Sequence, residues 1–337
     1  MVGDRSIGLH RRVEKLPLTG AARLELGVVM KRHHAWIGAG LGLSLLLGTM
    51  QPSAGCIAIP RDTPNQQDIK LPEQRAFLYS SGKTQHMVLS VKYEGAPSEF
   101  AWVIPTESQA KVGVQSGAPF HELWKATTPR YPARPQVARA SKAPGGSLEG
   151  ANADVQVLER KVAGPYDIAV LQAKTDGGLY DWLKSNGFST NATVRQALSS
   201  YVDKNWYFVA ARIRPGKQGQ VSKALEEGTI APLHIAYLAK ELSYPLRVTA
   251  GNPGTSKIEL FVLTSQPPQH AGFGVESFKM APRSKESFQV QGPPGTTTYE
   301  EAFPTLGKLI PKGGTLSKYS AVLPAAERKR ELVFSKL

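Results

Sequence analysis

The stretch AFLYSSGKTQHMVLSVKY at residues 76–93 carries the clearest structural signal in the chain. From Met87 to Tyr93 every second residue belongs to one apolar row, and this period of two is typical of a half-buried strand. The intervening Ser-Ser-Gly-Lys at 80–83 is a turn sequence between two strand-forming runs. The stretch therefore predicts a β-hairpin.

Further strands are predicted on both sides of this hairpin along the chain. Phe100, Trp102 and Ile104 alternate in the same way before Pro105, and we expect this run to form the next strand of the same meander. Apolar runs at six other places predict further strands: 155–162, 167–172, 206–214, 233–238, 246–250 and 258–263. The Gly-, Pro- and Thr-rich residues 272–314 are expected to wrap the surface, and 325–331 to form a helical turn.

Helices are fewer and shorter. Pro119 occupies the first turn of a short helix, in which Phe120, Leu123 and Trp124 share one face. Residues 179–186 form a second helix that Gly187 ends. A third begins at the capping residue Asn191, and its apolar residues recur at helical spacing: Val194, Ala197, Leu198, Tyr201 and Val202. The chain has no internal repeat. Together these elements predict one α+β domain, a predominantly antiparallel, sandwich-like β-sheet fold with a few short helices packed on one face.

The N-terminal part of the chain has the features of an export signal. Basic residues at 30–34 precede AWIGAGLGLSLLLGTM at 35–50, an uncharged run of sixteen residues. This is shorter than the ~20 residues that span a bilayer and fits the apolar region of a signal peptide. We predict cleavage after Gly55. Residues 30–55 are then the signal peptide, and 56–337 a single exported domain, located in the periplasm, the cell envelope or outside the cell. Residues 1–29 are an unstructured upstream extension or the result of a start assigned at Met1 instead of Met30.

Cys56 would be the first residue of the mature protein. The tetrad Ser53-Ala54-Gly55-Cys56 resembles a lipobox, although Ser53 stands where an apolar residue is usual. Two hypotheses follow: Cys56 is lipidated and anchors the protein, or it is a free N-terminal residue. As the only cysteine it cannot form an intramolecular disulfide. No other apolar stretch approaches eighteen residues, so we expect no transmembrane helix in the mature chain, and contact with a membrane only through this lipid.

The charge balance favours anionic partners without selecting one. The formal net charge is +14, and ten of these charges remain after residues 1–55 are removed. The Pro- and Gly-rich segment 127–153 is predicted to be a flexible loop, and its basic residues suggest contact with a polyanion: Arg130, Arg134, Arg139 and Lys142. Because the basic residues are scattered, an inert surface is the alternative. Aromatic residues do not interleave with them, so nucleic acid is not an expected partner.

The sequence predicts no catalytic, metal-binding or cofactor-binding residues. The four histidines of the mature chain lie far apart in sequence: His86, His121, His234 and His270. They match no metal motif, and the Gly-rich stretches lack the Lys-Ser/Thr of a phosphate loop. His121-Glu122 is the only adjacent acid–base pair. The interpretation is a non-catalytic protein, although an extracytoplasmic, hydrolase-like enzyme that assembles His121 or His234 with Asp167 stays open.

Five ordered motifs resemble a known family. They are EFAWVIP at 99–105, a VL…VAGPYD…AVL segment at 157–171, DWL…NGF at 181–188, YV…WYFVA at 201–210 and LSKY…LVF at 316–334. The chain resembles the bacterial exported proteins grouped as domain of unknown function 2330. The resemblance implies a secreted or envelope-attached protein without an assigned activity, and it transfers no functional residue. Such proteins often have several cysteines and sometimes a C-terminal anchor, whereas this chain has Cys56 alone. We therefore expect an exported protein that binds an envelope component or a partner protein.

Overall fold

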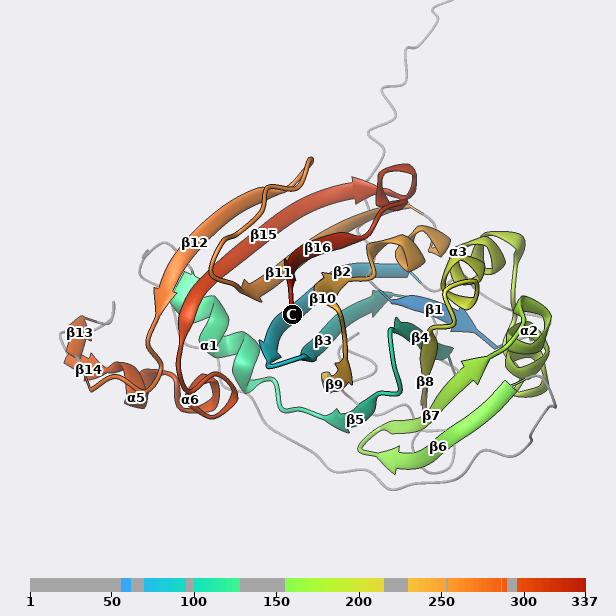
Figure 1. Ribbon diagram of the computed structural model, residues 1–337, viewed down its shortest axis with the longest axis horizontal. Coiled ribbons are helices and arrows are strands. Elements are labelled where there is room, and N and C mark those ends of the chain that lie inside the picture. The colour runs from blue at the N-terminus through green and yellow to red at the C-terminus, as the bar shows by residue number, and fades with distance from the viewer. Residues whose placement is uncertain are drawn as a thin grey trace, which may run out of the picture. The chain divides into compact units, whose positions relative to one another are not determined.

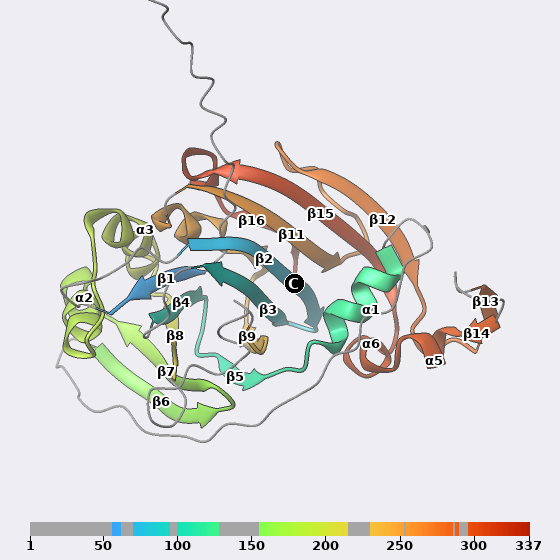
Figure 2. The same cartoon turned by 180° about the vertical axis from the view of Figure 1, so that it is seen from behind.

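The computed structural model describes residues 56–61, 70–94, 100–127, 155–214, 230–252, 254–285, 287–289 and 296–337. These residues belong to one compact unit, Thr49–Leu337. The unit contains one seven-stranded and one five-stranded sheet, two two-stranded ribbons and several short helices (Figure 1; Figure 2). The predicted α+β, mainly antiparallel and sandwich-like fold is confirmed.

The predicted hairpin lies at the centre of the seven-stranded sheet. It is formed by β2 (Lys70–Ser81) and β3 (Thr84–Glu94), and Ser81 pairs with Thr84 across the turn. Gly82 has a φ of 58°, a conformation that suits glycine. The sheet has the order β12 (Gly274–Met280), β15 (Gly314–Pro324), β11 (Thr255–Leu263), β2, β3, β9 (Leu233–Leu238) and β5 (Lys111–Val114). Its strands pair antiparallel except β2 and β11, which are parallel.

The strand at 100–104 belongs to the other sheet, so its predicted place in the meander is wrong. The five-stranded sheet has the order β1 (Ile57–Pro60), β4 (Phe100–Thr106), β8 (Tyr207–Ile213), β7 (Tyr166–Ala173) and β6 (Val155–Ala163). β4 pairs with β1 and β8 and is buried along its whole length. Apolar alternation indicates a strand, but it does not specify the partner of that strand.

The main core lies between the two sheets. Side chains from both sheets form one apolar cluster with the ribbon of β10 (Glu241–Tyr244) and β16 (Leu332–Lys336). Trp102 of β4, Leu89 of β3 and Leu332 of β16 are fully buried members of this cluster. The two sheets therefore pack face to face and fold as one body.

The helices cover the outer faces of both sheets, whereas the sequence predicted helices on one face. α2 (Asp176–Ser185) and α3 (Ala192–Val202) pack on the five-stranded sheet. Asn191 caps α3 as predicted, because its Oδ1 accepts a 2.8 Å bond from the amide of Val194. α1 (Ala118–Thr127), α5 (Tyr299–Ala302) and α6 (Pro304–Leu309) pack on the seven-stranded sheet, next to the ribbon of β13 (Ser287–Gln289) and β14 (Thr296–Thr298).

One further expectation is wrong, because residues 246–250 form a 3₁₀ helix, η2 (Leu246–Gly251), and not a strand. Arg328 holds the end of η2 and the residues that follow it. Its guanidinium donates to the carbonyls of Thr249, Asn252 and Gly254 at 2.7–3.0 Å. The segment 272–314 contains regular elements, namely β12, β13, β14, α5 and α6, and most residues of the edge strand β12 are exposed. Arg328 lies in η3 (Ala325–Arg328), the predicted helical turn.

Candidate functional site

The seven-stranded sheet brings together two histidines that are 148 residues apart in sequence. His86 of β3 and His234 of β9 project from the outer face of neighbouring strands, and His86 Nδ1 lies 3.1 Å from His234 Nε2. The strand register fixes this meeting, because His86 pairs with Ala236 while His234 pairs with Val88, two residues further along β3. We call His86 and His234 the histidine pair.

Tyr79 of β2 supports the histidine pair from the next strand. Tyr79 pairs directly with His86, and its ring stacks on the imidazole with centroids 4.6 Å apart and planes 2° apart. The two imidazoles are also nearly parallel, with an interplanar angle of 21°. Three rings on three adjacent strands therefore form a short aromatic row, in which each strand restricts the rotation of one ring.

The environment keeps the histidine pair uncharged at neutral pH. Burial lowers the pKa of His86, and the neighbouring His234 lowers it further; burial also lowers the pKa of His234. Burial raises the pKa of Tyr79 to about 12, so the phenol stays neutral as well. The 3.1 Å contact is then an N–H···N hydrogen bond between two neutral rings, one of which donates.

The histidine pair is accessible from the β5 side. The residue opposite His234 on β5 is Gly113, and a side-chain carbon added there would have no neighbour within 4 Å. Both histidines are partly exposed, and Leu238 at the end of β9 is 63% exposed. A small ligand could thus reach the two rings from solvent.

The structure separates the groups that the enzyme hypothesis would combine. His234 lies on the outer face of the seven-stranded sheet, on the side of Val88 and α1. Asp167 lies in the five-stranded sheet, on the face covered by α2 and α3, and its carboxylate binds Arg212 Nη2 at 3.0 Å. Asp167 is therefore part of a buried ion pair and not a free acid near a histidine.

The adjacent residues His121 and Glu122 also lie in different environments. His121 is exposed on α1, whereas Glu122 is buried and accepts hydrogen bonds from the amides of Thr305 and Leu306 at 2.8–3.1 Å. Glu122 thus binds the first turn of α6 and docks it on α1. His270 packs edge-on against Phe334 at 5.2 Å. In the described part of the chain, neither histidine has the acid partner that acid–base catalysis requires.

The tryptophans differ in burial. Trp102 and Trp182 are fully buried, and Trp206 is partly buried beside Tyr201. Trp124, predicted to share the apolar face of α1, is 47% exposed. Its position one residue beyond Leu123 turns it away from the sheet.

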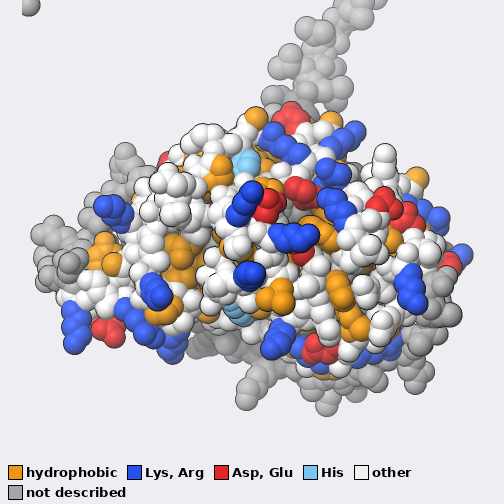
Figure 3. All heavy atoms as spheres, in the orientation of Figure 1, with side chains coloured by type: hydrophobic (Ala, Val, Ile, Leu, Met, Phe, Trp, Pro, Cys, Tyr) orange, Lys and Arg blue, Asp and Glu red, His pale blue; other side chains and the backbone are white. Residues whose placement is uncertain are grey.

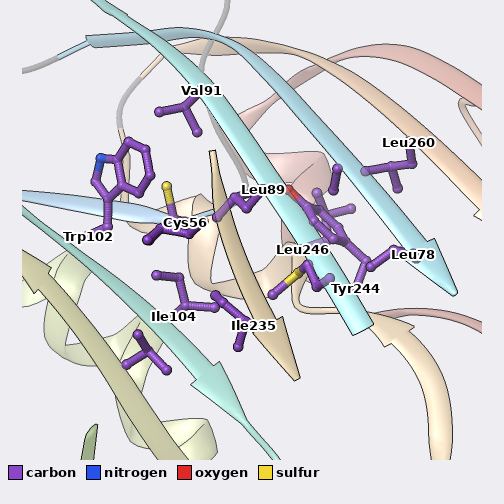
Figure 4. Close-up of a cluster of buried hydrophobic side chains, with 14 of the residues drawn as sticks. Cys56, Leu78, Leu89, Val91, Trp102, Ile104, Ile235, Tyr244, Leu246 and Leu260 are labelled. Carbon is purple, nitrogen blue, oxygen red and sulfur yellow. The ribbon is translucent and has the colours of Figure 1, made fainter. Parts of the chain in front are cut away.

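Cys56 lies in the main core. It is fully buried, and its thiol points between Trp102, Leu89 and Val91 (Figure 4). Asn252 holds the adjoining backbone, since its Nδ2 donates to the Cys56 carbonyl at 2.7 Å and its Oδ1 accepts from the amide of Ala58. Burial raises the pKa of the Cys56 thiol far above its ordinary value. A lipid on this sulfur would need space that the packed core does not offer.

The candidate polyanion contacts lie outside the described residues: Arg130, Arg134, Arg139 and Lys142. On the face in Figure 3, basic side chains are scattered and several lie beside acidic ones. Glu259, for example, lies 3.3 Å from Arg75 and 3.4 Å from Lys318 on the outer face of the seven-stranded sheet. Ion pairs of this kind reduce the attraction of that face for a polyanion.

A buried carboxyl that the sequence did not indicate lies between α3, η2 and β16. Burial raises the pKa of Glu331 above 4.5, against the opposing effects of the Tyr201 hydroxyl and the Arg247 guanidinium. Arg247 Nε is 3.7 Å from the carboxylate. The tyrosine and the arginine come from α3 and η2, so this cluster ties the C-terminal segment to the helical layer.

Replacing Glu331 by Gln should raise the stability of the protein at neutral pH relative to the unchanged chain. Folding raises the pKa of this carboxyl, so the folded protein favours the protonated form of Glu331. As the pH rises above 4.5 the carboxyl loses its proton, and the charged form lowers the stability of the folded state. The stability difference between E331Q and the unchanged chain should therefore grow from pH 4 to pH 7. Urea unfolding at several pH values measures it. A difference that is constant, or that shrinks with pH, would contradict the assignment.

The described residues contain neither a cluster of metal-binding side chains nor a membrane-spanning helix. Among the residues that the structure describes, no three or more His, Cys, Asp or Glu side chains are grouped so as to hold a metal ion. Within the same ranges no helix combines the length and apolarity needed to cross a bilayer.

Comparison with known proteins identifies one family. A family model described as an uncharacterized protein conserved in bacteria, domain of unknown function 2330, matches residues 53–272. No curated protein matches the sequence. Among solved structures, the crystal structure of baculovirus P35 is similar with a TM-score of 0.39 and 11% identity, over 80% of this chain and 97% of that chain. At that TM-score the similarity carries no functional inference.

Proposed function

Because the chain belongs to the family of uncharacterized proteins conserved in bacteria, domain of unknown function 2330, we propose a role for it as an exported, non-catalytic protein of the bacterial envelope. In this role it binds an envelope component or a partner protein after its signal peptide has been removed. The observation that carries the proposal is in the sequence: basic residues precede the sixteen-residue apolar run 35–50, and the small residues Ser53-Ala54-Gly55 follow it.

β1, which directly follows the predicted cleavage point, is an integral part of the fold. β1 begins at Ile57, and it is already paired with β4 and buried on both sides. Gly251 lies so close to β1 that an added side-chain carbon would overlap Ile57 Cδ1. A mature chain that begins at Cys56 therefore keeps the whole of β1.

The acidic side chains Asp167 and Glu122 are already bound to other groups of the protein, and this favours a binding role without catalysis. Asp167 is paired with Arg212, and Glu122 binds the amides of α6. The histidine pair is a group of polar side chains that is assembled from distant strands, partly exposed, and not engaged in an ion pair among the described residues. We propose that the outer face around it contributes to binding.

For Cys56 we propose the unmodified form in the mature protein. The thiol is fully buried among apolar side chains, whereas a lipid chain gains its anchoring energy only outside the protein, in the bilayer. The export proposal does not depend on this point.

Export is tested by expressing the full chain in a bacterium and separating the cytosol from the envelope and the medium. The mass of the N-terminal peptide is then measured by mass spectrometry. We expect a chain outside the cytosol that begins at Cys56 without added mass. The control variant Leu46→Arg places a charge in the apolar run and should keep the precursor uncut in the cytosol. An intact, folded precursor of the unchanged chain in the cytosol would overturn export, and a lipidated Cys56 would overturn the unmodified form alone.

Binding is tested on the exported protein. We expect it to sediment with purified envelope fragments and to leave envelope-derived glycan, phospholipid and peptide substrates uncleaved. Turnover of any of these substrates that copurifies with the protein would overturn the non-catalytic assignment.

A further inference from the structure

We infer that His86 and His234 form a binding site for a divalent transition-metal ion, with Cu²⁺ as the preferred ion. The inference goes beyond the proposed function and does not depend on export, because it rests on two imidazoles that the seven-stranded sheet holds together. Imidazole nitrogen is a common ligand for copper, zinc and nickel, and Cu²⁺ binds such ligands most strongly in this series.

The separation of the two nitrogens is the first argument. His86 Nδ1 and His234 Nε2 are 3.1 Å apart. An ion at the usual ~2.0–2.1 Å from each nitrogen would subtend an angle of roughly 100° between them. This angle lies between the tetragonal and tetrahedral arrangements, so the spacing of the two nitrogens suits two adjacent ligand positions of such an ion.

The rigidity of the rings is the second argument. Each histidine projects from a strand that is paired on both sides: β3 lies between β2 and β9, and β9 lies between β3 and β5. Tyr79 stacks on His86, and Val88 on the same face is fully buried under α1. Since the sheet fixes the two ligands, an ion binds without ordering a loop, which lowers the entropic cost of binding.

The contact between the two rings also favours binding. In the histidine pair one ring donates its N–H to the other. When an ion takes that place, the donor ring carries its proton on the opposite nitrogen, and the number of bound protons is unchanged.

Solvent or a bound partner must supply the remaining ligands. No third His, Cys, Asp or Glu joins the histidine pair in the described part of the chain. The space in front of Gly113 is open, so water molecules or groups of a bound partner can complete the coordination. A site with open positions binds more weakly than a closed structural site, and it leaves room for an exogenous ligand.

The inference is tested by titrating the full chain with Cu²⁺. The parent for this experiment carries His33→Ala and His34→Ala, which removes the adjacent imidazoles of the leader. We expect one Cu²⁺ per chain, and an electron paramagnetic resonance spectrum that shows hyperfine coupling to two nitrogens. His86→Ala and His234→Ala should each weaken binding at least about 10-fold, because each removes one of two protein ligands.

His121→Ala is the matched control, since His121 is an exposed histidine on the same side of the sheet. It should leave the affinity unchanged. Circular dichroism verifies the fold of each variant. If a variant does not fold, ¹⁵N-histidine labelling of the parent tests instead whether histidines bind the Cu²⁺ ion. The nitrogen hyperfine couplings change on labelling only if imidazole nitrogens are ligands of the ion. The inference is overturned if Cu²⁺ does not bind, or if the nitrogen hyperfine couplings are the same with and without the ¹⁵N-histidine label. It is also overturned if folded H86A and H234A bind Cu²⁺ as tightly as the parent does.

Discussion

Alkylation of Cys56 in the folded, full-length chain should be slower than alkylation of an exposed thiol by about 1,000-fold or more. The side chain is fully buried in the main core, and burial also raises the pKa of the thiol, so the reactive thiolate is scarce. A reagent can reach the sulfur only when the core opens, and core opening has a free energy that approaches that of global unfolding. Because Cys56 is the only cysteine, the thiol reaction reports on this site alone.

The matched control moves the thiol to the surface. A variant with Cys56→Ser and Ser116→Cys keeps one cysteine but places it in an exposed loop, and it should react at the rate of a free thiol. Both proteins should react alike in strong denaturant. If the folded, unchanged chain reacts as fast as this control variant does, then β1 is not packed in the core, and the argument against lipidation falls with it.

Replacing Trp102 by Ala should lower the free energy of unfolding by about 3–5 kcal/mol. Trp102 is fully buried between the two sheets, where its ring lies 5.5 Å from that of Tyr166 and 6.4 Å from that of Phe100. Removing the indole leaves a large cavity at the junction of β4 with the seven-stranded sheet. Urea unfolding at constant pH measures the loss.

Two further variants separate the cavity from other causes. Trp102→Phe keeps an aromatic ring, and the buried Nε1 of Trp102 has no hydrogen-bond partner in the described part of the chain, so this change should cost much less. Leu238→Ala removes an apolar side chain that is 63% exposed and should stay within about 0.5 kcal/mol of the unchanged protein. A Trp102→Ala loss as small as that of Leu238→Ala would mean that the two sheets do not share this core.

Local sequence patterns could not predict the candidate site. His86 and His234 each lie in a predicted strand, and they match no metal-binding motif in the sequence. Their meeting depends on β3 and β9 being neighbours in a particular register, although they are separated by β4 to β8 in the chain. The buried Glu331 was missed for a similar reason, since its neighbours Tyr201 and Arg247 come from distant segments.

Local patterns, by contrast, determined most of the secondary structure. Alternation at 84–93, the Gly82 turn and the Asn191 cap are properties of a few adjacent residues, and the structure contains all three. The strand β15 and the 3₁₀ helix η2 were not predicted correctly. The 3₁₀ helix is held by Arg328, almost eighty residues further along the chain.

The sequence by itself determined most of the strands, the hairpin turn and the Asn191 cap, the mainly antiparallel α+β class and the family. Only the tertiary structure decided that β4 leaves the hairpin for a second sheet, that Cys56 is enclosed in the core and that two distant histidines touch. The reason is physical. The period and turn chemistry of a segment follow from the geometry of its own backbone, whereas strand partners and side-chain meetings follow from apolar burial summed over the whole chain.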